Sequence, residues 1–256
     1  MKIIISPAKT MNTDRESGDV KGLPRFLNET EILMNEIRKL SFIEAKSLWK
    51  CNDKLAELNF IRFAEMNLKK GLTPAIFSYE GIQYKNMGPG VFSDKALEYI
   101  EEHLSILSGF YGILKPFDGV VSYRLEMQAK LEVGRYKNLY EFWGSKLYKA
   151  IADECCKDSC DDRHTFTILN LASKEYSQTI EKYRESRCRF ITVDFGEFID
   201  GGIKQKATLA KMARGDMVRF MAEKNIKNIE QIKEYGGFGF KFSEEFSGEN
   251  KLVFVR

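Results

Sequence analysis

The sequence has little histidine, little cysteine and no long apolar run. Its 256 residues include only two histidines, His103 and His164, so histidine-rich metal centres and histidine proton relays are not expected. The five cysteines are an odd number without regular spacing, which argues against a disulfide framework and favours a reducing compartment. No stretch reaches the roughly 18–20 apolar residues that span a bilayer, and Met1–Pro7 is too short an apolar run for a signal peptide. We therefore expect a cytoplasmic protein without a membrane segment.

The net charge is also small. Lys and Arg total 40 and Asp and Glu total 37, which gives a formal charge of +3 and a sequence pI of about 8.4. A dedicated nucleic-acid-binding domain usually has a pI above about 9. An anionic partner is therefore allowed, but its binding would need positive charge concentrated in one place. The 43% hydrophobic content is enough for a sizeable core and excludes disorder as the main state.

Short apolar segments and stretches of helical periodicity alternate irregularly along the chain. The segments expected to form strands are 2–6, 75–79, 120–123, 166–171, 189–195 and 251–255. The segments expected to form helices are two or three pieces of 25–69, then 93–107, 139–156, 206–224 and 228–234. The expected helix N-caps are Asn28, Ser41, Asn52 and Ser93. This order favours a mixed α/β (α+β) fold, with a central mixed sheet flanked by helices in a single domain over residues 1–256.

Polar residues follow three of the expected strands. The segments are Ser6–Thr10, Tyr79–Gly81 and Asn170–Tyr176. In open sheets, ligands bind beyond the carboxyl ends of parallel strands. If these three strands are parallel neighbours, one cleft would contain Ser6, Lys9, Glu80, Ser173 and Glu175. The alternative is that the three segments are ordinary polar loops.

The expected helix 206–224 has a basic face. At about 100° per residue, four cations fall within an arc of about 140°, namely Lys204, Lys211, Arg214 and Arg219. Gly215 interrupts this face, and an interior glycine costs about 1 kcal/mol relative to alanine. The glycine therefore indicates that something approaches the backbone closely, either a phosphate or a neighbouring helix. The alternative for the cations is the solvated face of an amphipathic helix.

Arg124 and Glu126 lie two residues apart, so they share a face if the segment is extended. An arginine facing a cleft can hold a phosphate or carboxylate in a bidentate manner. Glu126 would then orient the arginine or act as a base. The alternative is a surface ion pair worth less than about 1 kcal/mol.

Two glycine-containing segments, Leu107–Gly112 and Ile232–Gly239, are candidates for a helix-hairpin-helix-like element. Such hairpins present backbone N–H groups to a phosphate. Each segment is equally consistent with a plain glycine-rich turn. A third cluster contains Cys155, Cys156, Cys160 and His164, but its spacing matches no common metal site. We expect no metal and no cofactor, and no P-loop, dinucleotide motif or nucleophile elbow is present.

Several long segments together resemble one known family. They are Ile5–Met11, Leu107–Asp118, Tyr123–Met127, Leu139–Gly144, Asn170–Tyr176 and Lys211–Phe220. On these segments the chain resembles the YaaA family of bacterial peroxide-stress proteins, over nearly its whole length. The resemblance implies an unusual α/β fold with a positively charged cleft and a helix-hairpin-helix-like element. It also implies DNA binding and a role in limiting oxidative DNA damage, associated with lowered intracellular free iron.

The resemblance favours a phosphate-binding role for cations in the matching segments. These cations are Lys9, Lys115, Arg124, Lys211, Arg214 and Arg219. The expected partner is duplex or branched DNA, bound with little sequence specificity. The alternative is an enzyme acting on a nucleotide or nucleic-acid base in the same cleft, with Ser173, Glu175 and Glu126 as candidate catalytic residues. Direct iron sequestration is less favoured, because histidines and clustered carboxylates are few.

Overall fold

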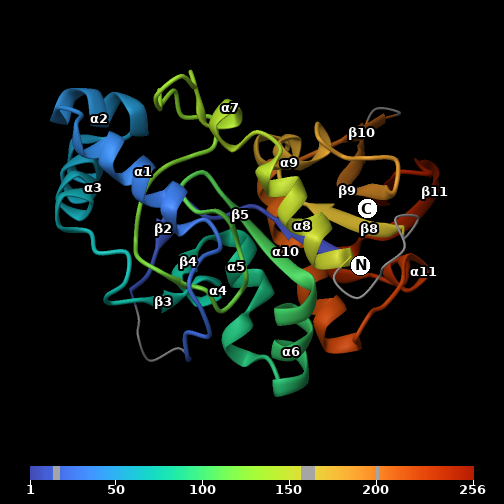
Figure 1. The fold of residues 1–256 in the computed structure, drawn as a ribbon. Helices are drawn as coiled ribbons and strands as arrows, with labels where there is room; N and C mark the ends of the chain where they lie inside the picture. The colour runs from blue at the N-terminus through green and yellow to red at the C-terminus, as the bar shows by residue number, and fades with distance from the viewer. Residues whose placement is uncertain (14–17, 157–164, 200–201) are drawn as a thin grey trace.

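A computed structural model describes residues 1–13, 18–156, 165–199 and 202–256. Its centre is a mixed sheet in the order β11-β12-β9-β8-β1-β5-β6, with β10 paired to β9 (Figure 1). The strands are β1 (Lys2–Ile5), β5 (Leu104–Ser108), β6 (Gly112–Leu114), β8 (Phe166–Leu171), β9 (Cys188–Ile199), β10 (Gly202–Lys204), β11 (Lys241–Gly248) and β12 (Lys251–Val255). The expected mixed sheet is therefore confirmed.

The parallel strands lie in the middle of this sheet. β1 pairs in parallel with both β5 and β8, and β8 and β12 each pair in parallel with β9. β6 and β11 are antiparallel to their neighbours. The residues Ile3–Ile5 are fully buried, because helices cover both faces of a central parallel strand. As a result, β1 and β8 end at the same edge of the sheet, with Ile5 opposite Leu171.

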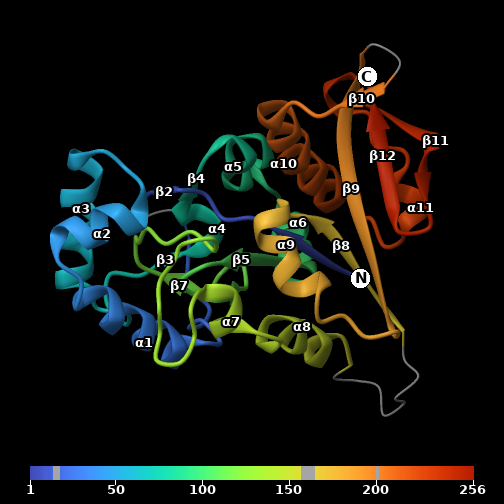
Figure 2. The ribbon, with the colours of Figure 1, turned by 90° about the horizontal axis from the view of Figure 1, so that it is seen from above.

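Helices cover both faces of the sheet. They are α1 (Leu27–Arg38), α2 (Phe42–Trp49), α3 (Asp53–Glu65), α4 (Ala75–Ser78), α5 (Ile82–Met87), α6 (Asp94–His103), α7 (Leu139–Trp143), α8 (Lys146–Cys156), α9 (Lys174–Glu181), α10 (Ala207–Lys224) and α11 (Ile229–Ile232). Figure 2 shows α10 and α8 on opposite sides of the sheet, with α1–α3 gathered at the end away from β11 and β12. Within the described ranges, no helix combines the length and apolar character needed to cross a membrane.

Two small two-stranded sheets complete the fold. β2 (Thr10–Met11) pairs with β4 (Tyr79–Glu80), and β3 (Thr73–Pro74) pairs with β7 (Gly119–Val120). The first pair connects the segment after β1 to the segment that leads into α5. It therefore places Lys9 and Glu80 in neighbouring segments, although the two residues are far apart in the chain.

Four of the expected elements differ in the structure. Of the expected strand 120–123, only Val120 lies in a strand, β7. Residues 75–78 of the expected strand 75–79 form the helical turn α4, and Tyr79 begins the short strand β4. The buried amides of the turn bond to a loop: Ala75 N donates to Asp118 O and Ile76 N to Pro116 O. A short apolar run does not distinguish a strand from a buried helical turn. The expected helix 93–107 ends at His103, and Leu104–Ser108 is the strand β5. The expected helix 139–156 is divided into α7 and α8 at Gly144, which has φ +48°.

Three of the four expected helix N-caps are confirmed, and one is wrong. Ser41, Asn52 and Ser93 accept backbone N–H groups at the starts of α2, α3 and α6, as expected. Asn28 lies inside α1 instead, because the helix begins at Leu27, two residues earlier than an Asn28 cap would give, with Phe26 at the N-cap position. The Thr30 hydroxyl bonds to the carbonyl oxygens of Phe26 and Phe110, which anchors this first turn to the core.

Neither candidate segment forms a helix-hairpin-helix. Leu107–Gly112 joins strands β5 and β6 and is buried throughout. A Cβ on Gly109 would lie 2.6 Å from Leu125 O, so this glycine permits close packing in the core. Ile232–Gly239 runs from α11 into the 3-10 turn Gly237–Gly239 and then into β11. A strand follows the glycines in both cases, where the motif needs a second helix.

Candidate functional site

A cavity of about 310 Å³ lies at the carboxyl ends of β1 and β8. Five segments contribute to its wall, namely 6–10, 80–84, 123–126, 173–176 and the α10 residues Lys211 and Arg214. The parallel pairing of β1 with β8 makes Ser6 and Ser173 leave the sheet side by side. A ligand at this edge would meet side chains from both ends of the chain and from its middle.

Ser6 and Ser173 both line this cavity and are hydrogen-bonded to each other. Ser173 N donates a hydrogen bond of 2.8 Å to Ser6 Oγ, and the two Oγ atoms are 3.2 Å apart. The Tyr84 hydroxyl donates to Ser6 O at 3.0 Å. Ser173 is the N-cap residue of α9, but its side chain makes no capping bond to the helix. The positive end of the α9 dipole therefore lies at the cavity without a side-chain acceptor over it.

Glu126 holds two of the predicted cations. Its Oε1 lies 3.0 Å from Lys9 Nζ and 3.3 Å from the Arg124 guanidinium. Arg124 Nε also donates to Trp49 O at 3.3 Å. Arg124 and Glu126 therefore lie on one side of the backbone, as expected, and they form a largely buried pair. This pairing offsets part of the positive charge at the cavity wall.

Glu175 is half-buried in the first turn of α9. Its Oε1 accepts the Gln128 N–H at 3.3 Å. Burial raises the pKa of the Glu175 carboxyl, the Gln128 amide opposes that change, the nearby charge of Glu126 raises the pKa further and Lys9 lowers it. A carboxyl with a raised pKa in a cavity can exchange a proton closer to neutral pH than an exposed glutamate.

Arg214 and Gln83 bring unsatisfied polar atoms to the same cavity. Arg214 Nε and Gln83 Nε2 are buried without a hydrogen-bond partner in the described part of the chain. Desolvation lowers the pKa of the Arg214 guanidinium, and the charge of Asp194 opposes this change. A buried cation without a direct counter-charge is costly, and an anion beside it would offset that cost.

The structure brings most of the predicted site residues together. All five residues expected to share a cleft line this cavity, namely Ser6, Lys9, Glu80, Ser173 and Glu175. Arg124, Glu126, Lys211 and Arg214 join them. Arg219 does not: it lies further along α10 and pairs with Glu223 at 2.8 Å. The cavity wall thus carries four cations, Lys9, Arg124, Lys211 and Arg214, and three carboxylates, Glu80, Glu126 and Glu175.

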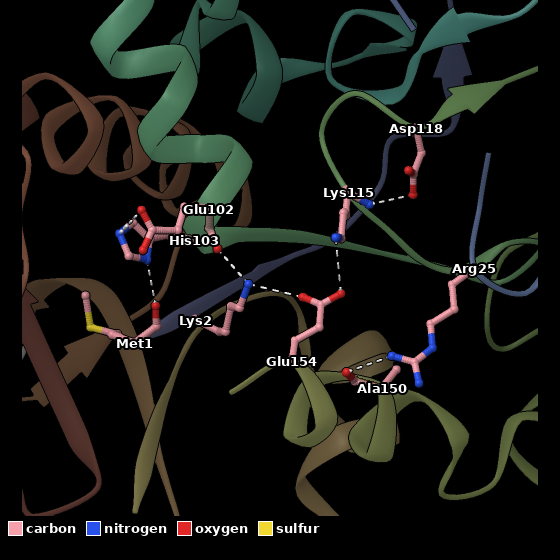
Figure 3. Close-up of polar contacts among 9 residues, drawn as sticks. All are labelled: Met1, Lys2, Arg25, Glu102, His103, Lys115, Asp118, Ala150 and Glu154. Atoms are coloured by element: carbon pink, nitrogen blue, oxygen red, sulfur yellow. Dashed lines mark hydrogen bonds and ion pairs between the residues drawn. The ribbon is translucent and has the colours of Figure 1, made fainter. Parts of the chain in front are cut away.

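Lys115 lies at a different cavity, of about 570 Å³ (Figure 3). Its Nζ is 3.7 Å from Glu154 Oε1, and Lys2 Nζ is 3.1 Å from the other oxygen of that carboxylate. Its backbone N–H donates to Asp118 Oδ2 at 2.8 Å. Burial raises the pKa of Asp118 to about 6, although the Lys115 amide and charge oppose the shift. Lys115 is therefore separated from the cations grouped around Lys9.

The sequence analysis did not identify Gln83 and Tyr84 as site residues. Both lie on the short helix α5, which packs against α10. They are in none of the family-like segments and follow no catalytic motif. Only the contact between these two helices brings them to the cavity. Tyr123 and Tyr176, which also line it, do lie in family-like segments.

A metal site is not evident in the part of the chain that the structure describes. No group of three or more His, Cys, Asp or Glu side chains is arranged to hold an ion there. Cys155 and Cys156, at the end of α8, are half-buried free thiols. Cys160 and His164, the other members of the cluster noted in the sequence, lie outside the described residues.

The fold and the site define an α/β protein with a cavity lined by charged side chains at the carboxyl ends of the parallel strands β1 and β8. The family model described as peroxide stress protein YaaA matches residues 1–246, and the chain belongs to this family. The family-like segments in the sequence therefore predicted the family correctly.

Curated relatives of this chain cover its whole length. A UPF0246 protein of Lachnoclostridium phytofermentans is 52% identical over 256 residues, which is 100% of this chain and 96% of the relative. A UPF0246 protein of Desulfitobacterium hafniense is 49% identical and covers 100% of this chain and 98% of its own length. A UPF0246 protein of Pediococcus pentosaceus is 46% identical with the same coverage.

Proposed function

We propose that this protein binds DNA during the peroxide stress response and thereby limits oxidative DNA damage. The observation that supports this most is the pair Lys211 and Arg214 on α10. Both line the cavity, and neither forms an ion pair with a carboxylate of the described residues. Unpaired cations on one surface are what the phosphate backbone of a nucleic acid requires. The family's association with lowered free iron belongs to this proposal, with no residue assigned to it.

The three carboxylates in the cavity bear on the kind of DNA binding expected. Glu126 already pairs with Lys9 and Arg124, which leaves fewer cations for phosphates. The protein should therefore contact few phosphates and read few bases, so that its affinity depends weakly on sequence. Binding in the cytoplasm to duplex or branched DNA fits this description.

The test is the salt dependence of DNA binding, measured by fluorescence anisotropy with labelled duplex and branched DNA. The logarithm of affinity should fall linearly with the logarithm of salt concentration, with a slope of about −0.9 per phosphate contact on duplex DNA. Lys211→Ala should weaken binding to all sequences by a similar factor and reduce the slope by about 1.

Lys115→Ala is the matched control, because Lys115 lies at the other cavity. It should bind DNA like the unmodified protein. Affinity that does not change with salt, absence of binding at about 50 mM salt, or equal effects of Lys211→Ala and Lys115→Ala would each contradict the proposal.

A second function is favoured by Glu175. A half-buried carboxyl with a raised pKa, beside Ser173 and Glu126, is an arrangement that can serve general acid–base catalysis. On this alternative the protein is an enzyme that acts on a nucleotide or nucleic-acid base, and the cations hold the phosphate. Incubation with a panel of nucleotides and nucleosides, followed by chromatography, tests it. Turnover by the unmodified protein that is lost in Glu175→Gln would support the enzyme. Equal results for the unmodified protein and Glu175→Gln would exclude a catalytic Glu175.

A further inference from the structure

We infer that the cavity contains a subsite for one terminal phosphate monoester, formed between the N-terminus of α9 and the α10 residues Lys211 and Arg214. The ligand class is a nucleotide with a terminal phosphate, either a free mononucleotide or the phosphorylated end of a DNA strand. This inference rests on the proposed function, because it names the group that the cavity binds. It differs from backbone binding in requiring a phosphate at a chain end.

The first observation is at the start of α9, an eight-residue helix. Its N-cap residue, Ser173, bonds to Ser6 instead of capping the helix. Within the described residues, the amides of Lys174 and Glu175 have no hydrogen-bond acceptor. Two free amides at a helix N-terminus are donors for an anion, and the helix dipole favours its negative charge.

The second observation is independent of α9. Arg214 and Gln83 come from α10 and α5, and each has a buried side-chain nitrogen without a partner among the described residues. Gln83 is only 8% exposed. Both residues line the same cavity as Ser173. Buried unsatisfied donors are uncommon in folded proteins and call for an acceptor such as a bound ion or water. An anionic ligand would supply the negative charge that Arg214 lacks, and it would accept from these two buried nitrogens once their side chains turn toward the cavity.

The carboxylates explain why one phosphate fits better than a chain of them. Glu126 and Glu175 line the cavity together with the cations. A second phosphate within the cavity would approach these carboxylates and be repelled by them. A single terminal phosphate at the α9 amides has the two cations Lys211 and Arg214 to offset the Glu175 carboxylate in the same first turn. A monoester also carries more negative charge than a backbone diester and presents three acceptor oxygens.

The rest of the cavity suits the nucleoside part of such a ligand. Tyr84, Tyr123 and Tyr176 line it, and each is less than a tenth exposed, so only a small apolar edge of each ring faces a base. The volume of about 310 Å³ is at the low end of the range for small-molecule sites. The Glu175 carboxylate offers acceptor oxygens for a sugar hydroxyl or a base amino group. The cavity thus accommodates one nucleotide unit.

The decisive variant is Lys174→Pro. Proline is tolerated at the first position of a helix, where it removes only an amide that has no partner in the helix. Ser173 has φ −71° and ψ 159°, which is the conformation preferred before proline. Lys174→Ala is the matched control, because it removes the same exposed side chain and keeps the amide. Circular dichroism and thermal unfolding of both variants establish that each is folded.

The experiment measures binding by isothermal titration calorimetry. The ligands are 5′-mononucleotides, the corresponding nucleosides, and single-stranded oligonucleotides with a 5′-phosphate or a 5′-hydroxyl. Each phosphorylated ligand that binds should do so at least about tenfold more tightly than its unphosphorylated partner, as expected for loss of charge-assisted hydrogen bonds. Lys174→Pro should lose most of this preference, and Lys174→Ala should keep it.

The two sources of the phosphate are distinguished by which ligand shows the preference. A preference for mononucleotides over nucleosides identifies a free nucleotide as the ligand. A preference only for 5′-phosphorylated strands identifies a DNA end. Equal binding with and without the phosphate, or equal effects of Lys174→Pro and Lys174→Ala, would overturn the inference.

The result also separates this inference from the proposed function. Salt-dependent binding of DNA with no preference for a terminal phosphate would leave DNA binding standing and remove the subsite. Binding of mononucleotides with a phosphate preference, but no binding of DNA, would establish the subsite and contradict DNA binding.

Discussion

Gly215 of α10 lies directly against the carbonyl oxygen of Gln83 in α5. A Cβ added at Gly215 would be 1.9 Å from that oxygen and 3.1 Å from Met87 N. Of the two explanations for this glycine in the basic helix, the neighbouring helix is therefore correct. The close backbone contact brings Gln83 of α5 and Arg214 of α10 to the same cavity.

Gly215→Ala should destabilise the protein, because the methyl group would meet backbone atoms that cannot rotate away. Overpacking of this kind costs about 1–3 kcal/mol or more, which outweighs the gain of about 1 kcal/mol in helix propensity. Urea unfolding followed by circular dichroism measures the difference. Gly90→Ala is the control, since no atom lies within 4 Å of a Cβ at Gly90. If Gly215→Ala is as stable as the control, the prediction is wrong, because α5 would then have shifted away from α10 without loss of stability.

Asp118 should make the protein less stable as the pH rises through the slightly acidic range. Burial raises its pKa from 3.8 to about 6, so between about pH 4 and 6 the folded state holds a proton that the unfolded state has released. The free energy of unfolding therefore falls across this window, and the cost remains at higher pH. A shift of about two units corresponds to about 3 kcal/mol at most.

Asp118→Asn tests this prediction, because asparagine removes the charge and its oxygen can still accept the Lys115 N–H. The variant should be more stable than the unmodified protein at pH 7, and its stability should fall less between pH 4 and 6. Chemical unfolding at several pH values measures both effects. Asp153→Asn, which removes an exposed acid at the same cavity, is the matched charge-removal control. Parallel profiles for Asp118→Asn and the unmodified protein would contradict the assignment.

The buried Tyr123 hydroxyl is hydrogen-bonded to two other buried hydroxyl groups. Its OH lies 2.8 Å from the Tyr79 OH and 2.6 Å from Ser108 Oγ. Tyr123→Phe should cost about 1–3 kcal/mol of unfolding free energy, because it leaves a buried hydroxyl without its partner. Thermal or urea unfolding measures the loss. Tyr136→Phe removes a hydroxyl whose one hydrogen bond among the described residues is with Arg135 at 3.4 Å, and it should change stability by less than about 0.5 kcal/mol.

Glu126→Gln should strengthen DNA binding. Glu126 neutralises Lys9 and Arg124, so removing its charge frees both cations for phosphates. Affinity should rise several-fold, and its salt dependence should become steeper. Anisotropy titrations against Glu132→Gln, an exposed acid in an adjacent segment, measure the effect. Weaker binding by Glu126→Gln than by this control would indicate that Glu126 contacts the ligand itself.

The sequence predicted correctly those elements whose burial or capping follows from the residues of the element itself. The β-branched run Ile3–Ile5 predicted a buried strand because it offers no polar face. Ser41 and Asn52 predicted helix starts because their side chains bond to amides three residues later. In Leu104–Ser108, by contrast, apolar periodicity continued from α6 into a strand, and pairing with β1 and β6 makes that segment extended.

The candidate site also has a part that the sequence predicted and a part that it did not. Ser6, Lys9, Ser173 and Glu175 could be grouped from the sequence, because polar residues after parallel strands meet at one edge of a sheet. The sequence could not predict that Lys115 and Arg219 lie apart from this group. Both are cations in family-like segments, and their charge does not indicate which part of the surface each side chain faces.

The sequence by itself determined the family, the mixed α/β class and the polar segments that follow β1 and β8, because these depend on motifs and on local patterns of burial. The tertiary structure alone decided that α5 packs against α10, that Gln83 joins Arg214 and that Glu126 pairs with Lys9. Those relationships depend on contacts between segments distant in the chain, and no local pattern of residues specifies the distance between them.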